Sequence, residues 1–126
     1  MVEEHANVSL IKRLDLTNLA GCAGLFAQHF VWHFFNPRLP EVQGDYVGPS
    51  GLRTFFEKLG ALSDRTFQIE PVSLSAIGDE LVVAHTRNRM VLEGRPIKID
   101  AVTVWRIVDG QIAEVWDIPS IHSVQP

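Results

Sequence analysis

From Thr66 onwards, hydrophobic residues recur at every second position, and this period of two constrains the fold more than any other feature of the sequence. Turn-forming residues interrupt the alternation at Gly78-Asp79, Glu93-Gly94 and Asp109-Gly110. Alternation divided by tight turns is typical of antiparallel strands joined by hairpins. The second half of the chain is therefore predicted to form an antiparallel sheet of four strands, with a bulge or kink at Pro71.

The first half of the chain follows a helical period instead. Its strongest signal lies between Ser50 and Leu62, where apolar residues recur at i, i+3, i+4, i+7 and i+10 and Ser50 is placed to cap the helix. Shorter helices are predicted within Asn7–Leu14 and after Thr17, where apolar residues recur at helical spacing as far as Phe30. Helices that precede a sheet in this order predict an α+β fold, with the sheet curled over the helices.

Between these helices lie an aromatic run and a segment rich in turn-forming residues. The run Phe30–Phe35 is apolar on both sides and is predicted to be a buried strand. The segment Asn36–Pro49 contains several prolines and glycines and is predicted to be a loop. With 126 residues and no linker or repeat, residues 1–126 are expected to form one domain.

Composition excludes several classes of function. The formal net charge is −4 and the basic residues are scattered, which argues against a nucleic-acid partner. Cys22 is the only cysteine, so a disulfide within the chain is excluded, and no spacing of His, Cys and carboxylates predicts a metal site. No cofactor-binding motif is found, so no cofactor is expected. The uncharged stretch Leu16–Pro37 contains polar residues that are costly in a bilayer, and the acidic N-terminus does not resemble a secretory signal. A cytoplasmic protein is expected.

Polarity assigns the faces of the two long strands. In Ile97–Val108 the even positions carry the charged residues, so the odd positions, which include Thr103, are expected to face the core. In Leu81–Leu92 the odd positions carry His and Arg, so the even positions Thr86, Asn88 and Met90 are expected to face inward.

The last strand has two possible registers. A two-residue turn at Asp109-Gly110 places Glu114 and Trp116 on the core face, whereas a three-residue turn with a glycine bulge places Ala113, Val115 and Asp117 there. The second register is preferred because it leaves Glu114 outside, near Arg106.

The core face then carries a small polar set that suits proton transfer. A desolvated Asp117 would have a raised pKa, and His33 from the aromatic strand would share or relay its proton. The alternatives are structural: Asp117 would reach water at the end of the sheet, and His33 would be a core histidine satisfied by the backbone. The candidate substrate-binding residues are Trp32, Asn36, Tyr46, Thr86, Asn88, Met90 and Thr103.

These segments carry a resemblance to a known family. The run FVWHFF, the helix GLRTFFEKL, the hairpin through EGRPIKIDAVTVWRI and the final VDGQIAEVWDI occur in the order and spacing typical of the SnoaL-like branch of the nuclear transport factor 2-like superfamily. The resemblance implies a cone: a strongly curved antiparallel sheet wrapped around N-terminal helices, the cystatin-like α+β barrel, with a pocket inside. It also implies a homodimer formed through the outer sheet face.

The resemblance implies roles for individual positions. Asp117 falls where SnoaL-like cyclases carry an acid/base aspartate, and His33 and Thr103 fall near the two aspartates of ketosteroid isomerases. Thr86 and Asn88 fall near the arginine and second aspartate of epoxide-hydrolase relatives. His33 and Thr103 replace the two aspartates of the isomerases, and Thr86 and Asn88 replace the arginine and aspartate of the hydrolases. Neither the isomerase pair nor the hydrolase triad is therefore present, and the chemistry does not follow from the fold.

Three functions remain open at this point. The first is an acid/base enzyme of isomerase, cyclase or hydratase type, acting on an apolar carbonyl or polycyclic compound through Asp117 and His33. The second is a non-catalytic dimer that binds a small apolar or aromatic molecule. The third is an interaction module that uses the outer sheet face. Contact between Asp117 and His33 would favour the enzyme, and an isolated Asp117 would favour ligand binding.

Overall fold

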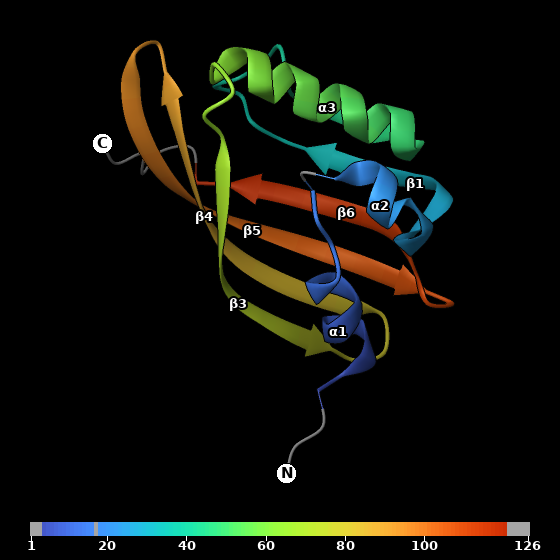
Figure 1. Ribbon diagram of the computed structural model, residues 1–126. Coiled ribbons are helices and arrows are strands. Elements are labelled where there is room, and N and C mark those ends of the chain that lie inside the picture. The colour runs from blue at the N-terminus through green and yellow to red at the C-terminus, as the bar shows by residue number, and fades with distance from the viewer. Residues whose placement is uncertain (1–3, 17, 121–126) are drawn as a thin grey trace.

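The computed structural model describes residues 4–16 and 18–120. Three helices and one 3-10 turn pack against a single sheet of six strands (Figure 1). In chain order the elements are α1 (Ala6–Lys12), α2 (Leu19–Cys22), η1 (Ala23–Leu25), β1 (Phe26–Phe34), β2 (Gly44–Val47), α3 (Gly48–Leu62), β3 (Gln68–Ile77), β4 (Leu81–Leu92), β5 (Arg95–Val108) and β6 (Gln111–Pro119). The predicted α+β class is confirmed.

The sheet has the strand order β2-β1-β6-β5-β4-β3 and curves around the helices without closing (Figure 1). All neighbouring strands are antiparallel except β1 and β6, which are parallel. The predicted antiparallel pairing of the four C-terminal strands is confirmed, and the parallel β1–β6 pair makes the complete sheet mixed. The chain leaves β1 through β2 and α3, crosses to the far edge at β3, and returns by three hairpins, so β6 arrives beside β1 in the same direction.

Two boundaries in the first half differ from the sequence prediction. Phe26 and Phe30 belong to β1, and α2 is a single turn, because Gly21 and Gly24 weaken a helix that the extended aromatic strand replaces. The segment predicted as a loop contains β2, and α3 begins at Gly48, so Ser50 lies inside the helix and does not cap it. Gly48 adopts a φ of 71°, which a glycine tolerates at this entry.

The core lies between α3 and the concave face of the sheet. Phe55 of α3 is 1% exposed and contacts the rings of four neighbours, with centroid distances from 5.0 to 5.5 Å. These neighbours are Trp32, Phe34, Tyr46 and Phe56. Trp32 also meets Trp105 of β5 edge to face, so the aromatic residues connect the helix to the middle of the sheet.

The predicted faces of the long strands are confirmed. Val82, Ala84, Asn88 and Met90 of β4 are buried, and the odd positions 99–107 of β5 are buried likewise. The predicted irregularity near Pro71 is also present, because the pairing of β3 with β4 shifts between Pro71 and Ser73.

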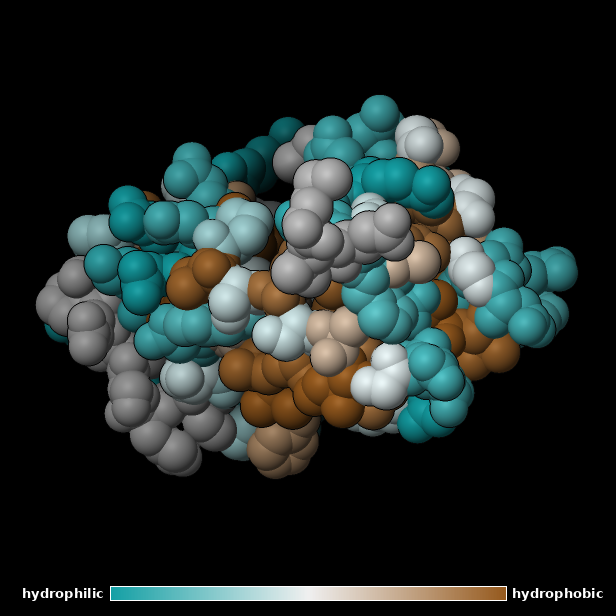
Figure 2. Space-filling model, turned by 90° about the horizontal axis from the view of Figure 1, so that it is seen from below, coloured by the Kyte–Doolittle hydropathy of each residue, from teal (hydrophilic) through white to brown (hydrophobic). Residues whose placement is uncertain are grey.

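Several large hydrophobic side chains remain on the surface, including Phe35, Val72, Ile77, Val102 and Ile118. Figure 2 shows hydrophobic residues gathered in a central band with hydrophilic residues around it. Among the described residues, no helix has the length and apolar character needed to cross a membrane.

Candidate functional site

The register of the last hairpin decides where Asp117 points. Asp109 and Gly110 both have positive φ and form a two-residue turn, so the predicted three-residue turn is wrong. The extra residue lies within β6 instead: Ile107 pairs with Ile112 and Arg106 pairs with Glu114, which leaves Ala113 as a bulge. The bulge places Asp117 on the predicted face of the sheet, because Asp117 pairs with Thr103 on the concave side. Ile112, rather than Ala113, joins Val115 in the core.

Asp117 is a carboxylic acid in an apolar setting. It lies between Thr103 of β5 and Phe34 of β1, both of which are buried. Burial raises the pKa of Asp117 to about 7, and the nearby indole N–H of Trp32 lowers it in part. This N–H is buried and has no hydrogen-bond partner within the described part of the chain, so its effect on the pKa is smaller than that of burial. Asp117 is half-buried by its exposed surface, and it does not line the cavity described next.

A cavity of about 850 Å³ opens on the same concave face. It lies between the end of α1, α3 and strands β3–β5. Its floor contains Ala84, Thr86, Thr103 and Trp105, and Phe56 and Phe67 contribute to its walls. The Trp105 indole N–H donates to Thr103 Oγ1 at 2.8 Å, and the Thr86 hydroxyl donates to Asn88 Oδ1 at 3.0 Å. Asp117 lies one strand beyond this floor, directly opposite Thr103.

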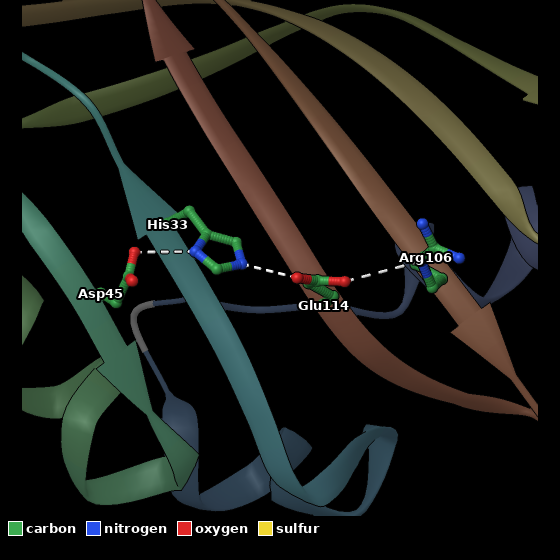
Figure 3. Close-up of polar contacts among 4 residues, drawn as sticks. All are labelled: His33, Asp45, Arg106 and Glu114. Atoms are coloured by element: carbon green, nitrogen blue, oxygen red, sulfur yellow. Dashed lines mark hydrogen bonds and ion pairs between the residues drawn. The ribbon is translucent and has the colours of Figure 1, made fainter.

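His33 lies on the other side of the sheet, and the predicted pairing with Asp117 is wrong. Trp32 and Phe34 point inward and are 2% and 7% exposed, so the residue between them points outward. There His33 Nδ1 lies 2.7 Å from Asp45 Oδ1, and Nε2 lies 2.7 Å from Glu114 Oε2 (Figure 3).

The outer face thus carries a chain of charged groups across four strands. Glu114 also faces Arg106 at 3.6 Å, which confirms the expected neighbourhood of these two residues (Figure 3). The His33 ring stacks on Trp116 with centroids 5.5 Å apart. Burial alone would lower the pKa of His33, but its hydrogen bonds with Asp45 and Glu114 outweigh this effect and raise the pKa. A homodimer formed through this face stays a prediction.

The remaining candidate residues do not gather at one place. Trp32 and Tyr46 are buried in the aromatic core, where the Tyr46 hydroxyl donates to the Val42 carbonyl. Both pack against Phe55, and Trp32 also places its indole N–H near Asp117. Asn36 and Met90 line a different cavity of about 520 Å³ near the hairpin between β4 and β5. Of the seven predicted substrate-binding residues, the structure brings only Thr86 and Thr103 to the larger cavity, with Asn88 beside them.

The family model described as the SnoaL-like domain matches residues 9–115, which is most of the chain. The chain belongs to the SnoaL-like family. No curated protein sequence matches this SnoaL-like chain significantly.

Solved structures share the fold of this SnoaL-like chain at low sequence identity. An NTF2-like protein from Burkholderia pseudomallei has 18% identity and a TM-score of 0.80 over 94% of this chain and 93% of that one. TerC, co-crystallized with polyporic acid, has 17% identity and a TM-score of 0.78 over 92% of each chain. A protein from Jannaschia sp. assigned to the SnoaL-like polyketide cyclases has 15% identity and a TM-score of 0.72 over 95% and 92%. At these identities the likeness establishes the fold alone.

Residues that the sequence analysis did not select form much of the cavity of this SnoaL-like domain. Leu14 and Leu16 come from the segment after α1, and Arg65 and Phe67 come from the segment between α3 and β3. The alternation after Thr66 marks Phe67 as inward, and the helical spacing within Asn7–Leu14 includes Leu14, but no local pattern marks Leu16 or Arg65. These residues reach the cavity only because α1 and α3 pack on either side of it.

Proposed function

We propose that the protein binds a small apolar or aromatic molecule in the 850 Å³ cavity on the concave face of its sheet. The volume lies within the range of about 300–1,000 Å³ that is usual for small-molecule sites. Trp105, Phe56 and Phe67 offer flat apolar surfaces, while Thr86 and Thr103 offer hydroxyl groups on the floor. This combination of apolar walls and few polar groups is the observation that carries the proposal.

Filling the cavity tests the binding function. Ala84 is 4% exposed and lies on the cavity floor, so Ala84→Leu places a larger side chain in the space that the ligand would occupy. Binding of a neutral fluorescent dye, Nile red, is expected to weaken about tenfold or more in Ala84→Leu, which corresponds to about 1.4 kcal/mol. Fluorescence titration measures the change.

The adjacent residue supplies the matched control. Val83 points to the outer face of the same strand, so Val83→Leu adds a similar side chain away from the cavity and should leave the dye affinity unchanged. Equal affinities in both variants, or no dye binding to the unmodified protein, would contradict the binding function.

A second candidate function is proton transfer by Asp117, and its setting favours this role. The side chain lies on the concave face opposite Thr103, and its pKa of about 7 lets the carboxyl group take up and release a proton at neutral pH. Isomerisation, aldol-type cyclisation and hydration of a carbonyl compound all need such a group. Because His33 lies on the other face, Asp117 has no histidine partner among the described residues, and this makes ligand binding the first proposal.

Proton transfer has a direct readout. The protein is expected to accelerate exchange of the α-protons of 1-tetralone with deuterium from heavy water, followed by NMR, by about a hundredfold over buffer. Asp117→Asn removes the group that accepts the proton and should abolish the acceleration. Exchange at the unmodified rate in Asp117→Asn would exclude Asp117 from the mechanism.

A further inference from the structure

The ionisable side chains of the proposed binding cavity lie at its rim. Among the described residues that line it, the ionisable ones are Lys12, Asp15 and Arg65, and all three are exposed. Thr103 and Trp105, at the floor, are 8% and 4% exposed. The cavity therefore has an uncharged interior and a rim with two cationic groups and one carboxylate, although the chain as a whole has a net charge of −4.

The two cations differ in their partners. Lys12 forms an ion pair with Glu4, which neutralises much of its charge. Arg65 forms no ion pair with any residue in the described ranges, so its guanidinium keeps its donors for another group. A guanidinium presents parallel N–H donors that match the two oxygens of a carboxylate.

The backbone around Arg65 fixes its position at the rim. The Arg65 N–H donates to the Gly60 carbonyl at 2.7 Å, and Arg65 and Asp64 both adopt positive φ. The neighbouring Thr66 hydroxyl bonds to the Ser63 carbonyl and accepts the N–H of Val91 from β4, which ties the segment to the sheet. Arg65 is thus anchored next to the cavity rather than carried on a free loop.

We propose that the ligand of this cavity is an aromatic or polycyclic acid, whose apolar body fills the interior and whose carboxylate binds Arg65 at the rim. This inference rests on the proposed binding function and adds the chemical class of the ligand. The apolar walls select the ring system, and the guanidinium, which has no ion-pair partner among the described residues, selects the anion over the corresponding amide or amine.

Three probes of one shape test the charge selectivity: 4-biphenylcarboxylic acid, its primary amide, and 4-phenylbenzylamine. The affinity of each probe is measured at neutral pH by fluorescence titration, as the probe competes with Nile red for the cavity. The acid is expected to bind about tenfold more tightly than the amide, as a charge-assisted hydrogen bond provides, and the amine is expected to bind most weakly.

Variants assign the selectivity to Arg65. In Arg65→Gln the preference for the acid over the amide should fall to about twofold or less, while the affinity for Nile red stays unchanged, and Arg65→Lys should keep part of the preference. Arg53→Gln makes the same change of charge on an exposed residue of α3 that does not line the cavity, and it should keep the full preference.

The outcomes separate this inference from the binding function on which it rests. If Nile red binds but the acid and the amide bind equally, or if Arg65→Gln keeps the preference, the assignment of an acidic ligand is overturned and the cavity remains a binding site. If neither the dye nor any probe binds to the unmodified protein, both the binding function and the acidic ligand are overturned.

Discussion

Asp117→Asn is expected to stabilise the protein at neutral and alkaline pH by about 2–4 kcal/mol. Burial raises the pKa of Asp117 from its ordinary value of 3.8 to about 7, so the folded state holds the proton more tightly than the unfolded state does. Above the folded-state pKa the fold must accommodate an ionised carboxylate in an apolar setting, and this cost lowers the free energy of unfolding. Asparagine has nearly the same shape and carries no charge.

The sign of the pH dependence follows from the same shift. Below about pH 4 Asp117 is protonated in both states, and the native protein and the variant should have similar free energies of unfolding. Between about pH 4 and pH 7 the unfolded state releases this proton and the folded state keeps it, so the native protein loses stability relative to the variant as the pH rises. Above about pH 7 the difference should be constant. Urea unfolding of both proteins across this range measures it.

An exposed aspartate serves as the control. Asp79 lies in the turn between β3 and β4, and Asp79→Asn should change stability by no more than about 0.5 kcal/mol at any pH. If Asp117→Asn were less stable than the native protein at high pH, the carboxylate would be stabilised as an anion in the fold. The proposed proton transfer near neutral pH would then lose its physical basis.

The last hairpin shows what an alternating pattern can and cannot predict. Polarity correctly predicts that Asp117 shares a face with Thr103, because the pattern records which positions are buried. It does not record where the extra residue is inserted. One residue added anywhere between Val108 and Asp117 has the same effect on the face of Asp117, so a turn and a bulge at Ala113 predict the same side for it.

The sequence of the aromatic strand does not indicate which of its residues face inward. The run Phe30–Phe35 is apolar on both sides, so the side that His33 faces depends on residues elsewhere in the chain. Phe55 of α3 packs against Trp32 and Phe34 and turns them inward, while Asp45 and Glu114 bind His33 on the outer face. These contacts join residues up to 81 positions apart, and no local pattern predicts them.

The resemblance implied a pocket inside the cone, but the full lining of the cavity could not be predicted, for a related reason. Its floor comes from β4 and β5, whose inward residues the sequence analysis identified, but its walls come from α1, α3, β3 and the segments that follow the two helices. The positions of those segments depend on how the helices pack over a curved sheet. The sequence therefore predicted Thr86 and Thr103 as candidate binding residues and missed Arg65, which has an ordinary local context.

Phe55→Ala is expected to cost about 3–5 kcal/mol of stability, a large part of the total for a domain of this size. The Phe55 ring is 1% exposed and contacts four aromatic rings from β1, β2 and α3 itself, so alanine leaves a cavity where helix and sheet meet. Nile red binding should weaken as well, because α3 also places Phe56 and Gly60 in the wall of the binding cavity. Urea unfolding and dye titration measure the two effects.

Phe35 provides the matched comparison, because it is also a phenylalanine but is 66% exposed. Phe35→Ala should change stability by no more than about 0.5 kcal/mol and should leave dye binding intact. A cost below about 1 kcal/mol for Phe55→Ala would mean that α3 is not held by this aromatic contact. The fold would then not fix the walls of the cavity. Neither the preference for an aromatic ligand nor the position of Arg65 at the rim would follow from it.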